Sequence, residues 1–171
     1  MKFTPIRKDT KFRVIYAVLL ILSIICFFPG FSGIIYTVMQ SIGIFLITAS
    51  LFMFIKYEST TLSYILIEKN GHFDFYVDKH TGKRGTYVCY FPVSDAVKLI
   101  KMEDNTKAEL RKEFKSIYFY NYGKNVFCGD KYIIVFENGD HHDAIIFEPD
   151  EKLIALIRDD MDRYKADADA D

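Results

Sequence analysis

The chain has 171 residues, half of them hydrophobic, and a formal net charge of −1. This total conceals a division, because residues 1–56 carry a net charge of +5 and residues 57–171 a net charge of −6. An acidic C-terminal part repels phosphate backbones, so we expect no nucleic-acid partner. The three cysteines are an odd number and one lies in an apolar segment, which argues against a disulfide framework.

The chain begins with a basic arm, residues 1–13, and continues into 42 consecutive positions without a charged side chain, from Val14 to Ile55. About 20 apolar residues cross a bilayer as a helix. Residues 14–56 therefore predict a transmembrane helical hairpin with helices at about 14–28 and 34–55. Proline and glycine place its turn at 29–33, where freed backbone groups must reach water.

The charges that flank the hairpin predict its orientation. Basic residues precede the first helix and Lys56 follows the second, whereas the turn carries no charge. Because basic residues stay on the cytoplasmic side, we expect a two-pass protein of the plasma membrane with both termini in the cytoplasm. A cleaved secretory signal is the alternative, but no small-residue cleavage site follows Phe28 and a second apolar span begins soon afterwards.

Few polar side chains lie in the predicted spans, and none of them is ionisable. The usual mark of an ion path is therefore missing, and the hairpin is typical of an anchor in the lipid bilayer. Gln40 and Ser41 are candidates for a polar contact with the first helix or with a second copy of the chain. The alternative is that Gln40 is a neutral side chain near the outer interface.

Residues 57–164 contain short segments typical of strands, separated by turn residues. Asn70-Gly71 and Asn138-Gly139 are strong hairpin signals. Residues 103–112 form a polar connection with at most one exposed helical turn. The seven predicted strands are Tyr64–Ile67, Phe73–Val77, Thr86–Phe91, Asp95–Met102, Ser116–Tyr120, Tyr132–Glu137 and Asp143–Phe147.

The last predicted element is a helix that begins with Pro149 at its first position. Apolar residues recur at helical spacing from Leu153 to Met161, so one face must cover a core. Residues 165–171 alternate alanine with aspartate after Lys165 and have nothing to bury. We expect them to form a disordered acidic tail.

Strands followed by a terminal amphipathic helix indicate an α+β domain, and three pieces carry a resemblance. These are the paired spans ahead of the domain, the segment Tyr90–Asp95 and the step Phe147–Glu151 into the last helix. The chain resembles bacterial two-pass inner-membrane proteins that carry a YcxB-like or other PH-like cytoplasmic C-terminal domain. The resemblance implies a seven-stranded antiparallel barrel capped by the C-terminal helix, and it supplies no catalytic residues.

The sequence predicts no catalytic residue, metal site or cofactor. Its cysteines and histidines lack metal-ligand spacing, and no phosphate-binding or dinucleotide motif is present. One basic cluster lies at the turn after the second strand: Lys79, His80, Lys83 and Arg84. This cluster is a candidate contact for a lipid headgroup or a partner, and the alternative is a solvated hairpin tip.

Three functions remain open at this point. The first is a non-enzymatic, membrane-anchored binding or scaffolding module, for a protein partner or a further copy of the chain, with an aromatic run from Tyr118 to Phe127 as contact surface. The second is a lipid-sensing domain at the inner leaflet. The third is a cysteine-dependent enzyme that uses Cys89 or Cys128 as its nucleophile.

Overall fold

The computed structural model describes residues 1–6, 10–28, 33–69, 71–82, 84–125 and 129–168. Several predicted features therefore lie wholly or partly outside the described residues: the turn at 29–33, Asn70, Lys83, Phe127, Cys128 and the end of the tail. The chain divides into two compact units. One is helical and comprises residues 9–60, and the other combines residues 1–8 with residues 61–171.

The helical unit contains α1 (Lys11–Cys26), α2 (Gly33–Phe54) and a π-helical turn (Ile55–Ser59). Both segments predicted to span the membrane are thus helical. At about 1.5 Å per residue, α2 is long enough for the ~30 Å hydrocarbon layer, whereas α1 is shorter. Among the described helices, α2 alone is by itself long and apolar enough to cross a membrane.

The two helices approach closely at Gly43 and share a polar contact at Ser50. Ser50 Oγ donates a hydrogen bond of 2.9 Å to the carbonyl of Tyr16. A Cβ atom on Gly43 would lie 2.6 Å from the Phe27 ring, so glycine permits close approach there. Ser41 Oγ instead donates to the carbonyl of Thr37 in its own helix. Ser50 therefore makes a polar contact between the helices, and the expected contact of Gln40 stays a prediction.

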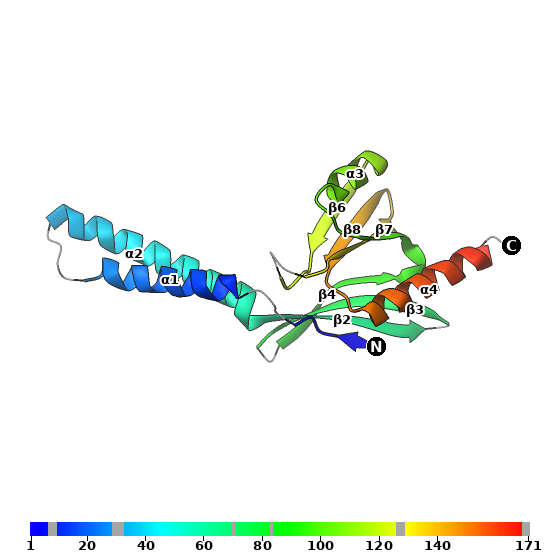
Figure 1. The fold of residues 1–171 in the computed structure, drawn as a ribbon, viewed down its shortest axis with the longest axis horizontal. Coiled ribbons are helices and arrows are strands. Elements are labelled where there is room, and N and C mark those ends of the chain that lie inside the picture. Colours follow the sequence, from blue (N-terminus) through cyan, green and yellow to red (C-terminus); the bar gives the residue numbers. More distant parts are fainter. Residues whose placement is uncertain (7–9, 29–32, 70, 83, 126–128, 169–171) are drawn as a thin grey trace. The chain divides into compact units, whose positions relative to one another are not determined.

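The first sheet has the strand order β1-β2-β3-β4. It consists of β1 (Lys2–Phe3), β2 (Thr60–Lys69), β3 (His72–Thr81) and β4 (Arg84–Pro92). Phe3 pairs with Tyr64 across the β1–β2 ladder, so the start of the predicted basic arm belongs to this sheet (Figure 1). β4 forms the opposite edge.

The second sheet has the order β5-β7-β8-β6 and follows a short 3-10 turn (Val93–Asp95). Its strands are β5 (Ala96–Lys101), β6 (Ile117–Asn121), β7 (Tyr132–Asn138) and β8 (His141–Phe147). All seven predicted strands are present. However, the described residues form two four-stranded sheets, and β6 runs parallel to β8. A closed antiparallel barrel is therefore not what these residues build.

The helix α3 (Thr106–Glu113) explains the position of β6. It carries the chain from β5 at one edge of the second sheet to β6 at the other, on the side that faces away from β2 and β3 (Figure 1). Leu110 is 1% exposed and packs with Ile133 and Ile146 in a second core. The predicted polar connection at 103–112 is thus largely a helix that covers the outer face of the sheet.

The main core lies between the two sheets and is rich in aromatic rings. Phe75 contacts Phe91 and Phe147 at ring-centroid distances of 5.1 and 5.4 Å. The helix α4 (Glu151–Ala168) adds Leu153 and Ile157, both fully buried. Burial of these apolar faces is the main source of stability for the domain.

The start and end of α4 differ from the prediction. Asp150 Oδ1 accepts a hydrogen bond of 2.8 Å from the Leu153 amide, so Asp150 caps the helix and Pro149 precedes the cap. At its other end α4 continues through Ala168, into the predicted disordered tail, whose last residues, 169–171, are not described. The expected α+β architecture with a C-terminal helix is confirmed.

Candidate functional site

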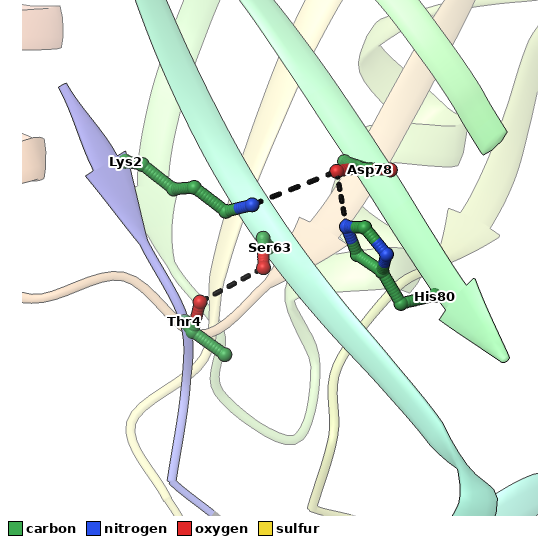
Figure 2. A network of polar contacts seen from close by, with 5 residues as sticks. All are labelled: Lys2, Thr4, Ser63, Asp78 and His80. Atoms are coloured by element: carbon green, nitrogen blue, oxygen red, sulfur yellow. Dashed lines mark hydrogen bonds and ion pairs between the residues drawn. The ribbon is translucent and has the colours of Figure 1, made fainter. Parts of the chain in front are cut away.

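The predicted basic cluster lies at the end of the β3–β4 hairpin, with Lys83 outside the described residues. His80 Nε2 lies 2.5 Å from Asp78 Oδ2, and Lys2 Nζ lies 3.7 Å from the same oxygen (Figure 2). Asp78 is buried, and its carboxylate offsets the charge of Lys2. The structure leaves Lys79 and Arg84 exposed at the hairpin.

The contacts around Asp78 hold the first sheet together. Thr4 Oγ1 and Ser63 Oγ share a hydrogen bond of 2.8 Å beside the Lys2–Asp78 pair (Figure 2). These contacts tie the N-terminal segment to β2 and β3. His80 therefore takes part in a structural network. Fewer side chains of the basic cluster are thus available to bind a headgroup.

A pocket of about 380 Å³ lies between β4 and the β6–β8 part of the second sheet. Its lining is contributed by strands far apart in the sequence. The lining residues are Val88, Cys89, Tyr90, Phe91, Pro92, Asp95, Tyr120, Tyr122, Phe136, Glu137, Asn138 and Asp143.

Strand alternation explains why polar side chains reach this pocket. Ile145 and Phe147 belong to the main core, so Asp143 lies on the same face of β8. Phe136 pairs directly with Asp143 across the β7–β8 ladder. The Phe136 ring stacks on Phe91 at a centroid distance of 4.2 Å. The apolar core therefore ends at this stacked pair, and the carboxylate of Asp143 lies next to the pair.

Asp143 is the most unusual side chain in the pocket, because it is a carboxylate with only 6% exposure. Its Oδ2 accepts a hydrogen bond of 2.8 Å from Asn138 Nδ2. Its Oδ1 has no hydrogen-bond partner in the described part of the chain, and His141 Nε2 lies 3.5 Å from it. A buried oxygen without a donor is costly, so this atom indicates a site for a missing partner.

The pocket raises the pKa values of the Cys89 thiol and the Tyr122 phenol. Burial, reinforced by the charge of Asp143, raises the pKa of Cys89 to about 11. Burial also raises the pKa of Tyr122, with smaller contributions from Cys89, Tyr120 and Asp143. Because the thiolate is the nucleophilic form, Cys89 is poorly suited to covalent catalysis at neutral pH. Cys128 lies outside the described residues.

Sequence reasoning missed most of this site. Cys89, Tyr120 and Tyr122 were expected to serve as a nucleophile or as contact surface, and all three line the pocket. Asn138 was interpreted only as a turn residue. The sequence signal for this pocket was Asp143, an acidic residue directly before the apolar segment Ala144–Phe147. The other lining residues come from other segments of the chain, so the sequence alone did not bring them together with Asp143.

Two sheets around a shared core, followed by an amphipathic C-terminal helix, define an α+β domain of the PH-like class. The chain matches the family model described as Bacterial PH-like domain (DUF6106) over residues 5–165, and it belongs to this family. No curated protein and no solved structure matches the chain. The PH-like part of the predicted resemblance is confirmed, and the match extends over the helical unit as well.

Proposed function

We propose that this protein is a non-enzymatic, membrane-anchored binding module whose PH-like domain docks a protein partner at the cytoplasmic face of the membrane. The pocket between β4 and the second sheet carries the binding role, because it is open, polar and aromatic. Its thiol has a pKa raised to about 11, which supports binding rather than catalysis.

The proposed anchor is the pair α1 and α2, whose outward faces are apolar. Large exposed hydrophobic residues on these helices include Val14, Val18, Ile21, Leu22, Ile25, Ile34, Ile35, Val38, Phe45 and Phe52. Soluble proteins rarely expose apolar surface on this scale, and lipid chains would cover it. The short α1 would then span with Lys11 and Arg13 at the interface.

One ion pair supports a hairpin whose two ends lie at the same membrane face. Arg13 Nη2, at the start of α1, lies 2.6 Å from Glu58 Oε1 in the turn after α2. Two charges are most favourable outside the hydrocarbon layer. With basic residues at these ends, we infer that both termini are cytoplasmic.

Cysteine labelling in intact cells tests this orientation. The native cysteines would be replaced by serine, and Ser32→Cys or Asp171→Cys would be added one at a time. A membrane-impermeant maleimide should label the first variant from outside and the second only after lysis. Labelling of Asp171→Cys from outside, or of neither variant before lysis, would contradict the proposed topology.

Affinity capture of the tagged full-length protein from mild detergent tests the binding role. A stoichiometric protein partner should be retained by the wild type, and less of it should be retained by Glu137→Gln, which removes a charge from the pocket lining. Glu68→Gln is the matched control, because Glu68 is exposed on β2 and does not line the pocket. Capture that is unchanged in Glu137→Gln would place the partner elsewhere, and no stoichiometric partner would contradict a protein-binding role.

Lipid sensing is the second candidate, favoured by the exposed Lys79 and Arg84 at the β3–β4 hairpin. Anionic membranes attract such residues by about 1 kcal/mol each near the surface. A Lys79→Ala, Arg84→Ala variant, reconstituted in nanodiscs with or without anionic lipid, would reveal this role through the exchange protection of the hairpin amides. Equal protection in both nanodisc types, in wild type and variant alike, would eliminate it.

A further inference from the structure

We propose that the pocket receives the guanidinium group of an arginine in an extended basic segment of the partner protein. This inference rests on the proposed function and specifies the chemistry of the partner. The lining contains three carboxylates, from Asp95, Glu137 and Asp143, and no lysine, arginine or histidine among the described residues. A concave surface lined by one sign of charge concentrates the opposite charge.

The buried carboxylate of Asp143 supplies the second and independent argument. Asn138 Nδ2 holds Asp143 Oδ2 at 2.8 Å and thereby orients the carboxylate. Asp143 Oδ1 has no hydrogen-bond donor in the described part of the chain although the side chain is 6% exposed, and the nearest cationic side chain, His141, places its Nε2 3.5 Å away. A planar guanidinium offers donors in a fixed fork that suits such an oxygen better than the point charge of an ammonium group.

The remaining lining suits the rest of an arginine side chain. Tyr120 is 44% exposed and lines the pocket, where its ring is able to stack on a guanidinium plane, whereas the Tyr90 ring packs on Tyr76. Val88, Phe91 and Phe136 also line the pocket, and their apolar atoms would contact the methylene stem.

The strand order indicates that the arginine belongs to an extended segment. β4 and β6 are the outer strands of their sheets, and residues of both line the pocket. Among the described strands β4 pairs only with β3, so its other edge has no strand partner; on β4 the carbonyl of Val88 accepts a hydrogen bond of 3.3 Å from Tyr122 Oη. Extended peptides commonly add to exposed strand edges of this kind.

Calorimetry on the full-length protein in detergent micelles tests the inference. The probe is a capped pentapeptide with one central arginine between glycines, and its matched control carries citrulline, which has nearly the same shape but no charge. We expect the arginine peptide to bind, the lysine analogue to bind more weakly, and citrulline to weaken binding by about tenfold or more. Equal binding of the arginine and citrulline peptides would overturn the proposal.

Pocket variants locate the binding event. Asp143→Asn should weaken the arginine peptide by about tenfold and Glu137→Gln by a few-fold, whereas Glu68→Gln should leave its affinity unchanged. If Asp143→Asn does not fold, Glu137→Gln and Tyr120→Leu carry the test, because Glu137 and Tyr120 are exposed. Unchanged affinity in both variants would overturn the proposal. If the full-length protein still captures a stoichiometric partner from detergent in that case, only the arginine specificity fails and the proposed binding module stands. The failure of this inference is therefore distinguishable from the failure of the proposed function.

Discussion

Tyr64 illustrates how single side chains connect the two sheets. It is fully buried, and its hydroxyl donates a hydrogen bond of 2.8 Å to the carbonyl of Tyr122. The same hydroxyl accepts a hydrogen bond of 3.1 Å from the amide of Glu148. The carboxylate of Glu148 in turn accepts from the amide and the side chain of Asn125, at 2.7 and 2.6 Å. Each buried polar group in this chain of contacts depends on its neighbour.

We therefore expect Tyr64→Phe to destabilise the domain by about 1–3 kcal/mol, because it removes a hydrogen bond to the Tyr122 carbonyl and leaves the buried Glu148 amide without this acceptor. Thermal unfolding in detergent, followed by circular dichroism, would measure the loss. Tyr118→Phe is the control, since Tyr118 is exposed and should unfold like the wild type. An unchanged melting temperature for Tyr64→Phe would show that water or a shifted neighbour replaces the hydroxyl.

Cys89 should react slowly with iodoacetamide at pH 8, because its pKa of about 11 keeps the thiol protonated. The rate should rise with pH until about pH 11. Asp143→Asn should lower this pKa and speed the reaction, because the charge of Asp143 contributes to the shift. The measurement uses a Cys26→Ser, Cys128→Ser background. A rate at pH 8 equal to that of a free thiol would contradict it.

At the scale of elements, the helices α3 and α4 of the PH-like domain cover different surfaces. α3 places Leu110 against the outer face of the second sheet, and α4 places Leu153 and Ile157 against the main core. β7 and β8 are thus buried on both faces, which explains their nearly continuous apolar runs. Helical spacing in α4 is visible in the sequence, whereas α3 offers only one fully buried leucine.

Replacing Ile157 by Asp should unfold the PH-like domain, because Ile157 has 0% exposure and an unpaired buried charge costs several kcal/mol. Leu156→Asp should destabilise it less, since Leu156 is only partly buried. Ala155→Asp, on the exposed face of α4, should be close to neutral. Melting temperatures of the three variants decide the matter, and a wild-type value for Ile157→Asp would mean that α4 does not cover the core.

At the scale of the whole molecule, the chain forms a discontinuous domain. Residues 1–8 belong to the same compact unit as residues 61–171, although the helical unit separates them in sequence. β1 pairs with β2, and Phe3 stacks near Tyr64 at a ring-centroid distance of 6.3 Å. The N-terminal segment is therefore part of the fold and more than a basic arm.

Replacing residues 2–5 by glycine and serine, with the length unchanged, should lower the melting temperature of the PH-like domain. The change removes the β1–β2 pairing, the Phe3 contact and the Lys2–Asp78 ion pair. Lys2→Ala alone should have a smaller effect, because it leaves the β1–β2 pairing and the His80–Asp78 contact in place. If the fully replaced variant melts with the wild type, β1 contributes nothing to the stability of the domain.

The sequence by itself determined the apolar helices, the seven strands and the amphipathic C-terminal helix. These features depend on local periodicity, turn residues and chain stiffness, and each of these signals is contained in a short stretch of sequence. It also indicated the basic hairpin tip around Lys79, although the approach of Lys2 to Asp78 brings together two strands that are far apart in the sequence.

Only the tertiary structure decided which strands are neighbours and what gathers between them. The parallel pairing of β6 with β8, the burial of Leu110 and the β1–β2 ladder join residues far apart in the chain. The pocket has the same origin, because Cys89, Tyr120 and Asp143 come from three different strands. Pairing energies between distant strands depend on the packing of the whole core, so no local pattern specifies them.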